Sequence, residues 1–188
     1  ALTAVFVLSV LLGCQRPLGL VRPEVPSLTI DLDIPAPVDS AGGLMVADLN
    51  GDELPDYLVT VPGHLAVHDN SGRELWVERA DIVVSMKSEA NGLPGHHGPG
   101  VGAGDVDGDG ATEVVYLTRD GALHIVDGES GTSELAVRPP VPEGAERWES
   151  AMVADFRGAG DRDILLQATN LEGYRTGRHL AAYSFEAL

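Results

Sequence analysis

The sequence predicts an all-β protein built from repeated four-stranded antiparallel units, and three observations indicate this fold class. Short apolar runs rich in β-branched residues are separated by turns rich in Gly and Asp. A loop with a polar oxygen donor at alternate positions occurs twice, and a weaker copy occurs once more, at intervals of about fifty residues. The chain is 44% hydrophobic but only 5% aromatic, as expected for a globular β-rich protein.

The central loop, residues 105–113, has the spacing of a calcium site. Its side-chain donors occupy the first, third, fifth and ninth positions, and the carbonyl of the seventh residue adds one more oxygen. In order, these five are Asp105, Asp107, Asp109, Ala111 as the carbonyl, and Glu113. A hard divalent cation takes about six to eight oxygen ligands, and glycines allow so tight a turn. We therefore predict a calcium ion in this loop.

An EF-hand is the competing interpretation of this loop, but it requires a Glu at the twelfth position and a helix on either side. The twelfth residue here is Tyr116, and the flanking sequences are typical of strands. The ion is therefore expected to join two strands of a hairpin. A third interpretation is that the acid-rich loops are solvated turns without an ion.

The same spacing recurs upstream in Asp48, Asn50, Asp52, the Leu54 carbonyl and Asp56. A weaker version appears at residues 155–163, where Arg157 and Ala159 replace the third and fifth ligands. We predict two calcium sites and no ion in this last loop. Arg157 either reaches between Asp155 and Asp163 in place of the ion or lies in solvent, and both alternatives exclude a third ion.

On these loops the sequence resembles the FG-GAP/VCBS repeat family, whose β-propeller blades are related to those of integrin α-subunits. The family's calcium loops have the form Asp-x-Asp-x-Asp-Gly-x-x-Asp, and the resemblance covers most of the chain from Ala41. The sequence lacks the Phe-Gly and Gly-Ala-Pro signatures of integrins. The resemblance implies a calcium-binding propeller but not integrin-like adhesion.

The expected strands fit this plan, because four strands per unit are typical of a propeller blade. The units span about residues 41–86, 99–138 and 148–188. Their strands are predicted at residues 44–47, 57–61, 64–68 and 74–77; at 101–105, 113–118, 122–126 and 133–137; and at 151–154, 164–167 and 179–185. The third unit lacks a fourth strand, and rings usually close with about four to eight blades. We expect about three blades of a truncated or partial ring.

The N-terminal region predicts export and anchoring. Residues 1–12 are apolar, and the following Gly13-Cys14 resembles a bacterial lipobox, so we predict a lipoprotein signal peptide over residues 1–14 with Cys14 lipidated. The alternative is an ordinary buried or membrane-anchor cysteine. Residues 15–40 read as a Pro-rich tether followed by an alternating strand at residues 27–34 that completes another blade. Since the chain begins at Ala1 without a Met or a basic region, we expect it to be a fragment.

The charge limits the partners. A formal net charge of −17 disfavours nucleic acid and anionic membrane surfaces, so we expect membrane contact only through the lipid anchor. With Cys14 as the single cysteine, intramolecular disulfides are impossible. The predicted location is outside the cytoplasm, in the periplasm or at the cell surface, lipid-anchored to the bacterial membrane.

Several loop residues are candidates for a ligand face: His96, His97, Arg147 and Trp148, with Lys87 and the Tyr174-Arg175 pair. In propellers that this sequence resembles, these loops share the face opposite the calcium loops. Aromatic and cationic side chains there suit carbohydrate stacking and carboxylate pairing.

Two function classes follow from these features. The favoured one is a non-enzymatic binding or scaffold module for a polysaccharide or a protein. The alternative is part of a polysaccharide-degrading enzyme such as a rhamnogalacturonan lyase, because some of those lyases have similar calcium-bearing propellers. His96, His97, Lys87 or Arg147 would then be the acid/base candidates. We assign no catalytic residue, because the sequence shows no phosphate-binding loop, nucleophile elbow or Cys/His cluster.

Overall fold

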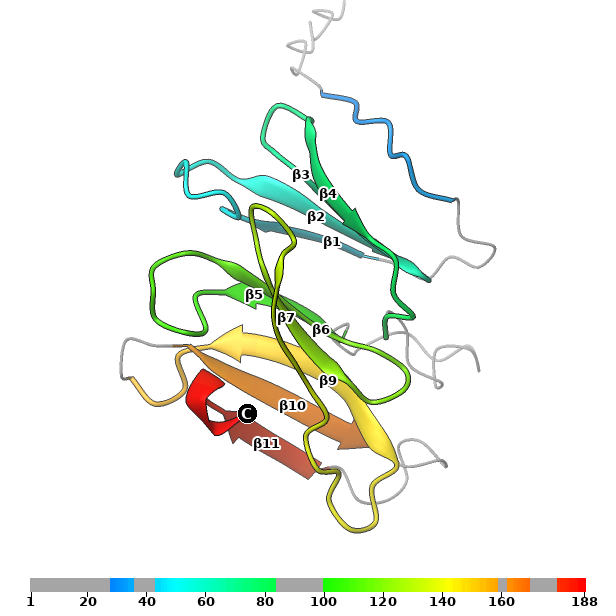
Figure 1. The fold of residues 1–188 in the computed structure, drawn as a ribbon, viewed down its shortest axis with the longest axis vertical. Helices are drawn as coiled ribbons and strands as arrows, with labels where there is room; N and C mark the ends of the chain where they lie inside the picture. The colour runs from blue at the N-terminus through cyan, green and yellow to red at the C-terminus, as the bar shows by residue number, and fades with distance from the viewer. Residues whose placement is uncertain (1–27, 36–42, 84–99, 159–161, 170–178) are drawn as a thin grey trace, which may run out of the picture.

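The computed structural model describes residues 28–35, 43–83, 100–158, 162–169 and 179–188, which form three antiparallel β-sheets (Figure 1). The first sheet contains β1 (Gly43–Ala47), β2 (Asp56–Val61), β3 (His64–His68) and β4 (Glu74–Glu78). The second contains β5 (Val101–Gly104), β6 (Glu113–Leu117), β7 (Leu123–Asp127) and β8 (Ser133–Val137). The third contains β9 (Arg147–Ala154), β10 (Asp163–Thr169) and β11 (His179–Tyr183), followed by a 3₁₀ turn (Phe185–Ala187).

Each sheet is a meander in which consecutive strands pair through short turns. The three acidic loops therefore occupy equivalent places, because each joins the first strand of its sheet to the second. We call them the first loop (residues 48–56), the second loop (residues 105–113) and the third loop (residues 155–163). In Figure 1 the three sheets stack in sequence order, and the loops lie along one side of the stack.

Two cores hold the stack together, and β6 contributes to both. Alternate residues of a strand point to opposite faces. Val114 and Tyr116 accordingly pack with Leu58 and Trp76 in the core between the first two sheets. Val115 and Leu117 enter the core shared with the third sheet. All five residues of β6 are buried, so the second sheet is covered on both faces.

A close contact also ties the first two sheets together beside the acidic loops. The indole Nε1 of Trp76 donates a hydrogen bond to the Gly128 carbonyl at 2.8 Å. The Gly128 amide donates to the Thr112 carbonyl at 2.9 Å. A Cβ atom at position 128 would clash with the Thr112 carbonyl oxygen and lie 2.8 Å from that of Leu49, so this approach requires a glycine.

The all-β class and the strand order are confirmed, with three differences. The last strand ends at Tyr183 rather than at residue 185, because Phe185 begins the 3₁₀ turn. Residues 28–34 contain no strand; Ile30 instead lies against the β3–β4 turn, where a Cβ at Gly72 would be 3.0 Å from its Cγ1. β9 begins at Arg147 rather than at residue 151, because Arg147 and Trp148 pair with β10 beyond a bulge between Gln167 and Ala168. Across the described residues the sheets form an open stack that does not close into a ring.

Several predicted features lie outside the described residues. These are the signal peptide with Cys14, the first part of the tether, His96, His97, Lys87 and the Tyr174-Arg175 pair. Among the residues that are described, no helix has the length and apolar character needed to cross a membrane.

Candidate metal centre

The second loop brings three carboxylates to one point. Asp105, Asp107 and Asp109 each offer an oxygen, and these oxygens all lie within 4.8 Å of one another. One oxygen of each carboxylate is fixed by a backbone amide two or three residues further on. The three bonds are Gly108 N to Asp105 Oδ1 at 2.8 Å, Asp109 N to Asp107 Oδ1 at 3.0 Å, and Ala111 N to Asp109 Oδ1 at 2.7 Å. The loop backbone therefore orients the acids before any ion binds.

The first and second loops follow the same backbone path. Gly108 and Gly110 have φ values of 86° and 93°, in the left-handed region. The first loop has Gly51 at φ 75° and Glu53 at φ 65° in the equivalent places. A side chain in this conformation costs about 1–2 kcal/mol, so the loop geometry is maintained against a local penalty at Glu53.

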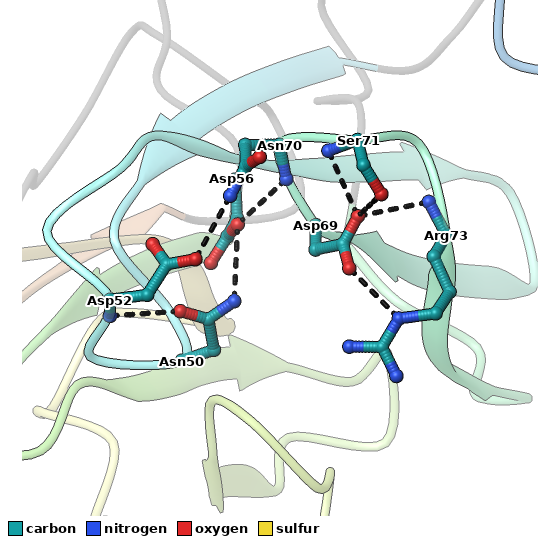
Figure 2. Close-up of polar contacts among 7 residues, drawn as sticks. All are labelled: Asn50, Asp52, Asp56, Asp69, Asn70, Ser71 and Arg73. Atoms are coloured by element: carbon teal, nitrogen blue, oxygen red, sulfur yellow. Dashed lines mark hydrogen bonds and ion pairs between the residues drawn. The ribbon is translucent and has the colours of Figure 1, made fainter.

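The first loop is closed by the β3–β4 turn, as Figure 2 shows. The Asn70 amide donates to Asp56 Oδ1 at 3.0 Å, and its side-chain Nδ2 donates to Asp52 Oδ2 at 2.9 Å. Asn50 donates more weakly to Asp56, at 3.5 Å. These bonds link Asn50, Asp52 and Asp56, three of the predicted ligands, to one another or to Asn70, a contact that the sequence analysis missed. Its position just beyond a strand that pairs with β2 was the available signal.

The turn that carries Asn70 is itself held by Asp69 (Figure 2). Asp69 accepts hydrogen bonds from the Ser71 hydroxyl at 2.6 Å and from Arg73 Nε at 2.9 Å, besides both of their backbone amides. These bonds, that of the Ser71 hydroxyl foremost, hold the pKa of Asp69 well below its usual range. In the second sheet Asp127 holds the equivalent turn by accepting from Ser130.

The ninth residue of each loop is a buried acid that begins the second strand of its sheet. Asp56, Glu113 and Asp163 are 0%, 1% and 1% exposed. Asp56 accepts the Leu49 amide at 2.9 Å, and Glu113 accepts the Val106 amide at 2.6 Å. A buried carboxylate is costly unless hydrogen bonds and a counter-charge offset its desolvation. A cation held in each loop would offset this cost.

The buried position of Glu113 raises its pKa. Burial raises the pKa of Glu113 to about 7, and the negative charges of Asp107, Glu134 and Asp105 add to the rise, while the Val106 hydrogen bond opposes it. Without a cation, this side chain therefore holds a proton up to near-neutral pH.

The third loop has an internal cation. Arg157 Nε lies 2.7 Å from Asp163 Oδ1, and the Asp163 side chain is 1% exposed. Asp155 keeps the local fold by accepting the Gly158 amide at 2.7 Å. Of the two sequence-based alternatives, the one in which Arg157 neutralises the loop therefore agrees with the structure at Asp163, and Arg157 lying free in solvent does not.

Two residues of the predicted ligand face, Arg147 and Trp148, lie within the described residues, and Trp148 does not lie at the surface. Trp148 is 1% exposed and donates from Nε1 to the Pro139 carbonyl at 3.3 Å. The register shift in the β9–β10 pairing skips Glu149, so Trp148 enters the same core as Ala151. Trp148 presents no stacking surface, so that prediction was wrong. Arg147 lies on β9 as well and pairs with the buried Glu149 at 2.8 Å.

A groove that the sequence did not predict lies beside the first two sheets. It encloses about 420 Å³ and is lined by Glu78, Asp81, Thr118, Asp120 and the stacked rings of Tyr116 and His124. The centroids of the two rings are 4.8 Å apart, and the ring planes are nearly parallel. Cross-strand pairing of β6 with β7 produces this stack, which only the register reveals.

Replacing the internal cation should destabilise the protein. Arg157→Met leaves Asp163 buried without its partner and should lower the free energy of unfolding by about 1–3 kcal/mol, measured by denaturant titration. Arg119→Met is the matched control, since Arg119 pairs with Asp81 at 3.3 Å and both side chains are exposed. Its loss should stay within about 0.5 kcal/mol. Equal losses in the two variants would contradict the role given to Arg157.

Glu113 should make the calcium-free protein less stable as pH rises. The folded state keeps a proton that the unfolded state loses near pH 4.5, so stability falls between pH 4.5 and about 7 and then levels off. Melting temperatures in chelator across this range should show the fall, and Glu113→Gln should flatten it. An unchanged slope in the variant would contradict the assignment.

Comparisons with known proteins agree with this repeat structure. The FG-GAP-like repeat family matches two overlapping segments, residues 48–116 and 105–166, each of which runs from one acidic loop into the next sheet. No curated protein matches the chain. Among solved structures it is similar to the V. cholerae biofilm matrix protein Bap1, at 22% identity and a TM-score of 0.45. That match covers 69% of this chain and 19% of the other. Since the family match spans more than half of the sequence, the chain belongs to the FG-GAP-like repeat family.

Proposed function

We propose that this chain is a calcium-stabilised, non-catalytic binding or scaffold module that works outside the cytoplasm. The observation that carries the proposal is the second loop, where three converging carboxylates adjoin the buried Glu113. Calcium bound there would neutralise the acids and hold the first two strands of the sheet together. The residues that would hold the two ions are Asp48, Asn50, Asp52, Leu54 and Asp56 in the first loop, and Asp105, Asp107, Asp109, Ala111 and Glu113 in the second.

The donor chemistry fits calcium. Every donor in both loops is a carboxylate, amide or carbonyl oxygen, which hard cations prefer over the nitrogen and sulfur ligands typical of zinc. The third loop offers Arg157 instead of a third-position acid, and its cationic side chain already pairs with Asp163. Two ions per chain is therefore the proposed content.

The structural use of the buried acids favours a scaffold over an enzyme. Asp56 and Glu113 accept backbone amides of their own loops, so their carboxylates shape the fold. Arg147, an acid/base candidate of the lyase alternative, pairs with the buried Glu149. Neither arrangement presents a reactive group to a substrate, which supports the non-catalytic proposal.

We further propose that the three sheets are blades of a partial β-propeller. The four-stranded meanders, stacked in sequence order, support this architecture. A carbohydrate or protein ligand would bind on the exposed loops or in the groove beside Tyr116 and His124, where rings and carboxylates lie together. The lipid anchor at Cys14 would hold the module on the bacterial membrane.

Calcium should raise the melting temperature of the protein. Binding to the native state adds roughly 2.7 kcal/mol per site at a hundredfold excess over Kd, or about 2–4 °C for each kcal/mol. Asp107→Ala removes a central ligand and should abolish about half of the calcium-induced shift, measured by scanning fluorimetry with calcium or chelator. Asp81→Ala, an exposed acid outside the loops, should leave the shift unchanged. A melting temperature indifferent to calcium would refute the proposal.

Cys14→Ser should release the protein from the membrane. Lipid attachment at this residue would supply the anchor, and stable anchoring requires more than a single acyl chain. Fractionation of bacteria that express the natural gene and the variant should show the wild type in membranes and the variant in the soluble fraction. Equal membrane retention of both proteins would count against the lipobox.

A further inference from the structure

Every side-chain oxygen among the predicted ligands of the first loop accepts a hydrogen bond from the protein. Backbone amides of the loop itself supply most of the donors. They donate from Gly51 and Asp52 to Asp48 Oδ1, from Glu53 to Asp48 Oδ2, from Asp52 to Asn50 Oδ1, from Leu54 to Asp52 Oδ1 and from Leu49 to Asp56 Oδ2. The two remaining oxygens, Asp52 Oδ2 and Asp56 Oδ1, accept from Asn70 in the β3–β4 turn.

The second loop leaves oxygens uncommitted. Asp105, Asp107 and Asp109 each accept a single backbone amide through Oδ1. Their Oδ2 atoms accept no hydrogen bond from any residue that the structure describes. An ion can therefore bind these three carboxylates without breaking a hydrogen bond that the protein makes.

Asp52 and Asp109 occupy the same loop position, so they show the difference directly. Asp52 Oδ1 accepts the Leu54 amide at 2.9 Å, as Asp109 Oδ1 accepts the Ala111 amide at 2.7 Å. Oδ2 is then the oxygen that either side chain can offer to an ion. In the first loop Asn70 Nδ2 already donates to that atom at 2.9 Å. A donor N–H group at this point faces the place where a cation would bind.

The equivalent turn of the second sheet has no such donor. Glu113 pairs with Asp127, whereas in the first sheet the pairing of Tyr57 with His68 places Asp69 opposite Asp56. The residue after Asp69 is Asn70, and its equivalent after Asp127 is Gly128, which has no side chain. The Gly128 amide donates to the Thr112 carbonyl instead of to a ligand carboxylate. The two loops therefore differ at one position of the facing turn.

We propose that Asn70 competes with calcium for Asp52 in the first loop, so that calcium fills the second loop first and the first loop only at higher concentration. This inference rests on the proposed calcium function and adds an order of binding to it. An ion at the first loop must displace the Asn70 side chain from Asp52 Oδ2, and losing a hydrogen bond to a charged group is costly. The second loop carries no corresponding cost.

The number of charged ligands acts in the same direction. The predicted ligands include three carboxylates in the first loop, where Asn50 takes the third position, and four in the second. Calcium affinity depends on the charge and the rigidity of the ligand set, so we expect the first loop to bind at least about tenfold more weakly.

The test is isothermal titration calorimetry of the 188-residue chain with calcium. The wild type should bind in two steps, of which Asp107→Ala removes the tighter and Asp52→Ala the weaker. Asn70→Ala removes only the side-chain donor, because the backbone amide still reaches Asp56. It should tighten the weaker step at least about threefold and leave the tighter step unchanged. In chelator the same variant should melt at a lower temperature, because Asp52 loses a partner.

Ser71→Ala is the matched control. It lies in the same turn, is also uncharged, and removes one hydrogen bond to Asp69, which is not a ligand. Its two calcium affinities should equal those of the wild type; an equal tightening there would overturn the role of Asn70. If Asn70→Ala does not fold, Asn70→Asp keeps the side-chain size, replaces the donor with an acceptor and should also tighten the weaker step.

The outcomes separate this inference from the proposed function. Weaker binding in Asn70→Ala would make Asn70 a ligand rather than a competitor and would overturn the inference. Two steps of equal affinity in the wild type would overturn it as well, while calcium binding itself would stand. Absence of any calcium binding would refute both the inference and the proposed function.

Discussion

The fold depends on a carboxylate buried at the start of the second strand of every sheet. Asp56, Glu113 and Asp163 are sealed from solvent, and in the first two loops the acid accepts the amide of the loop's second residue. This bond sets the loop path and hence the register of the first two strands. A charge in such a place requires neutralisation, and the repeats meet that need differently. In the third loop Arg157 supplies the positive charge, whereas the second loop offers three converging carboxylates that could hold an ion.

The first two loops also contribute residues to the packing between neighbouring sheets, so their chemistry affects the whole stack. Leu49 and Val106, the second residues of the first two loops, enter the two cores between sheets. Gly128 packs between the Thr112 and Leu49 carbonyls, and the Gly128 carbonyl accepts a hydrogen bond from the Trp76 indole. An ion that orders either loop would therefore also order the contact between neighbouring sheets. The proposed scaffold role follows from this coupling of local charge to long-range packing.

Sequence reasoning located the loops and strands because their signals are local. Acids at alternate positions, glycines for left-handed turns and β-branched runs are read directly from the chain. It failed for residues whose position depends on tertiary contacts. Trp148 was expected on a ligand face, but β9 continues to pair with β10 past a bulge at Glu149, and this turns Trp148 inward. Asn70 closes the first loop from a turn fourteen residues beyond Asp56, and the close approach at Gly128 depends on a neighbouring sheet. Residues 28–34 alternate like a strand but have no pairing partner among the described strands.

The central claim is that two loops take calcium while Arg157 replaces it in the third. Anomalous scattering from crystals grown with calcium tests this most directly, because it locates each ion without assumptions about stability. The account predicts two peaks, one among Asp48, Asp52 and Asp56 and one among Asp105, Asp107 and Asp109. A peak between Asp155 and Asp163, or the absence of a peak at the second loop, would contradict it.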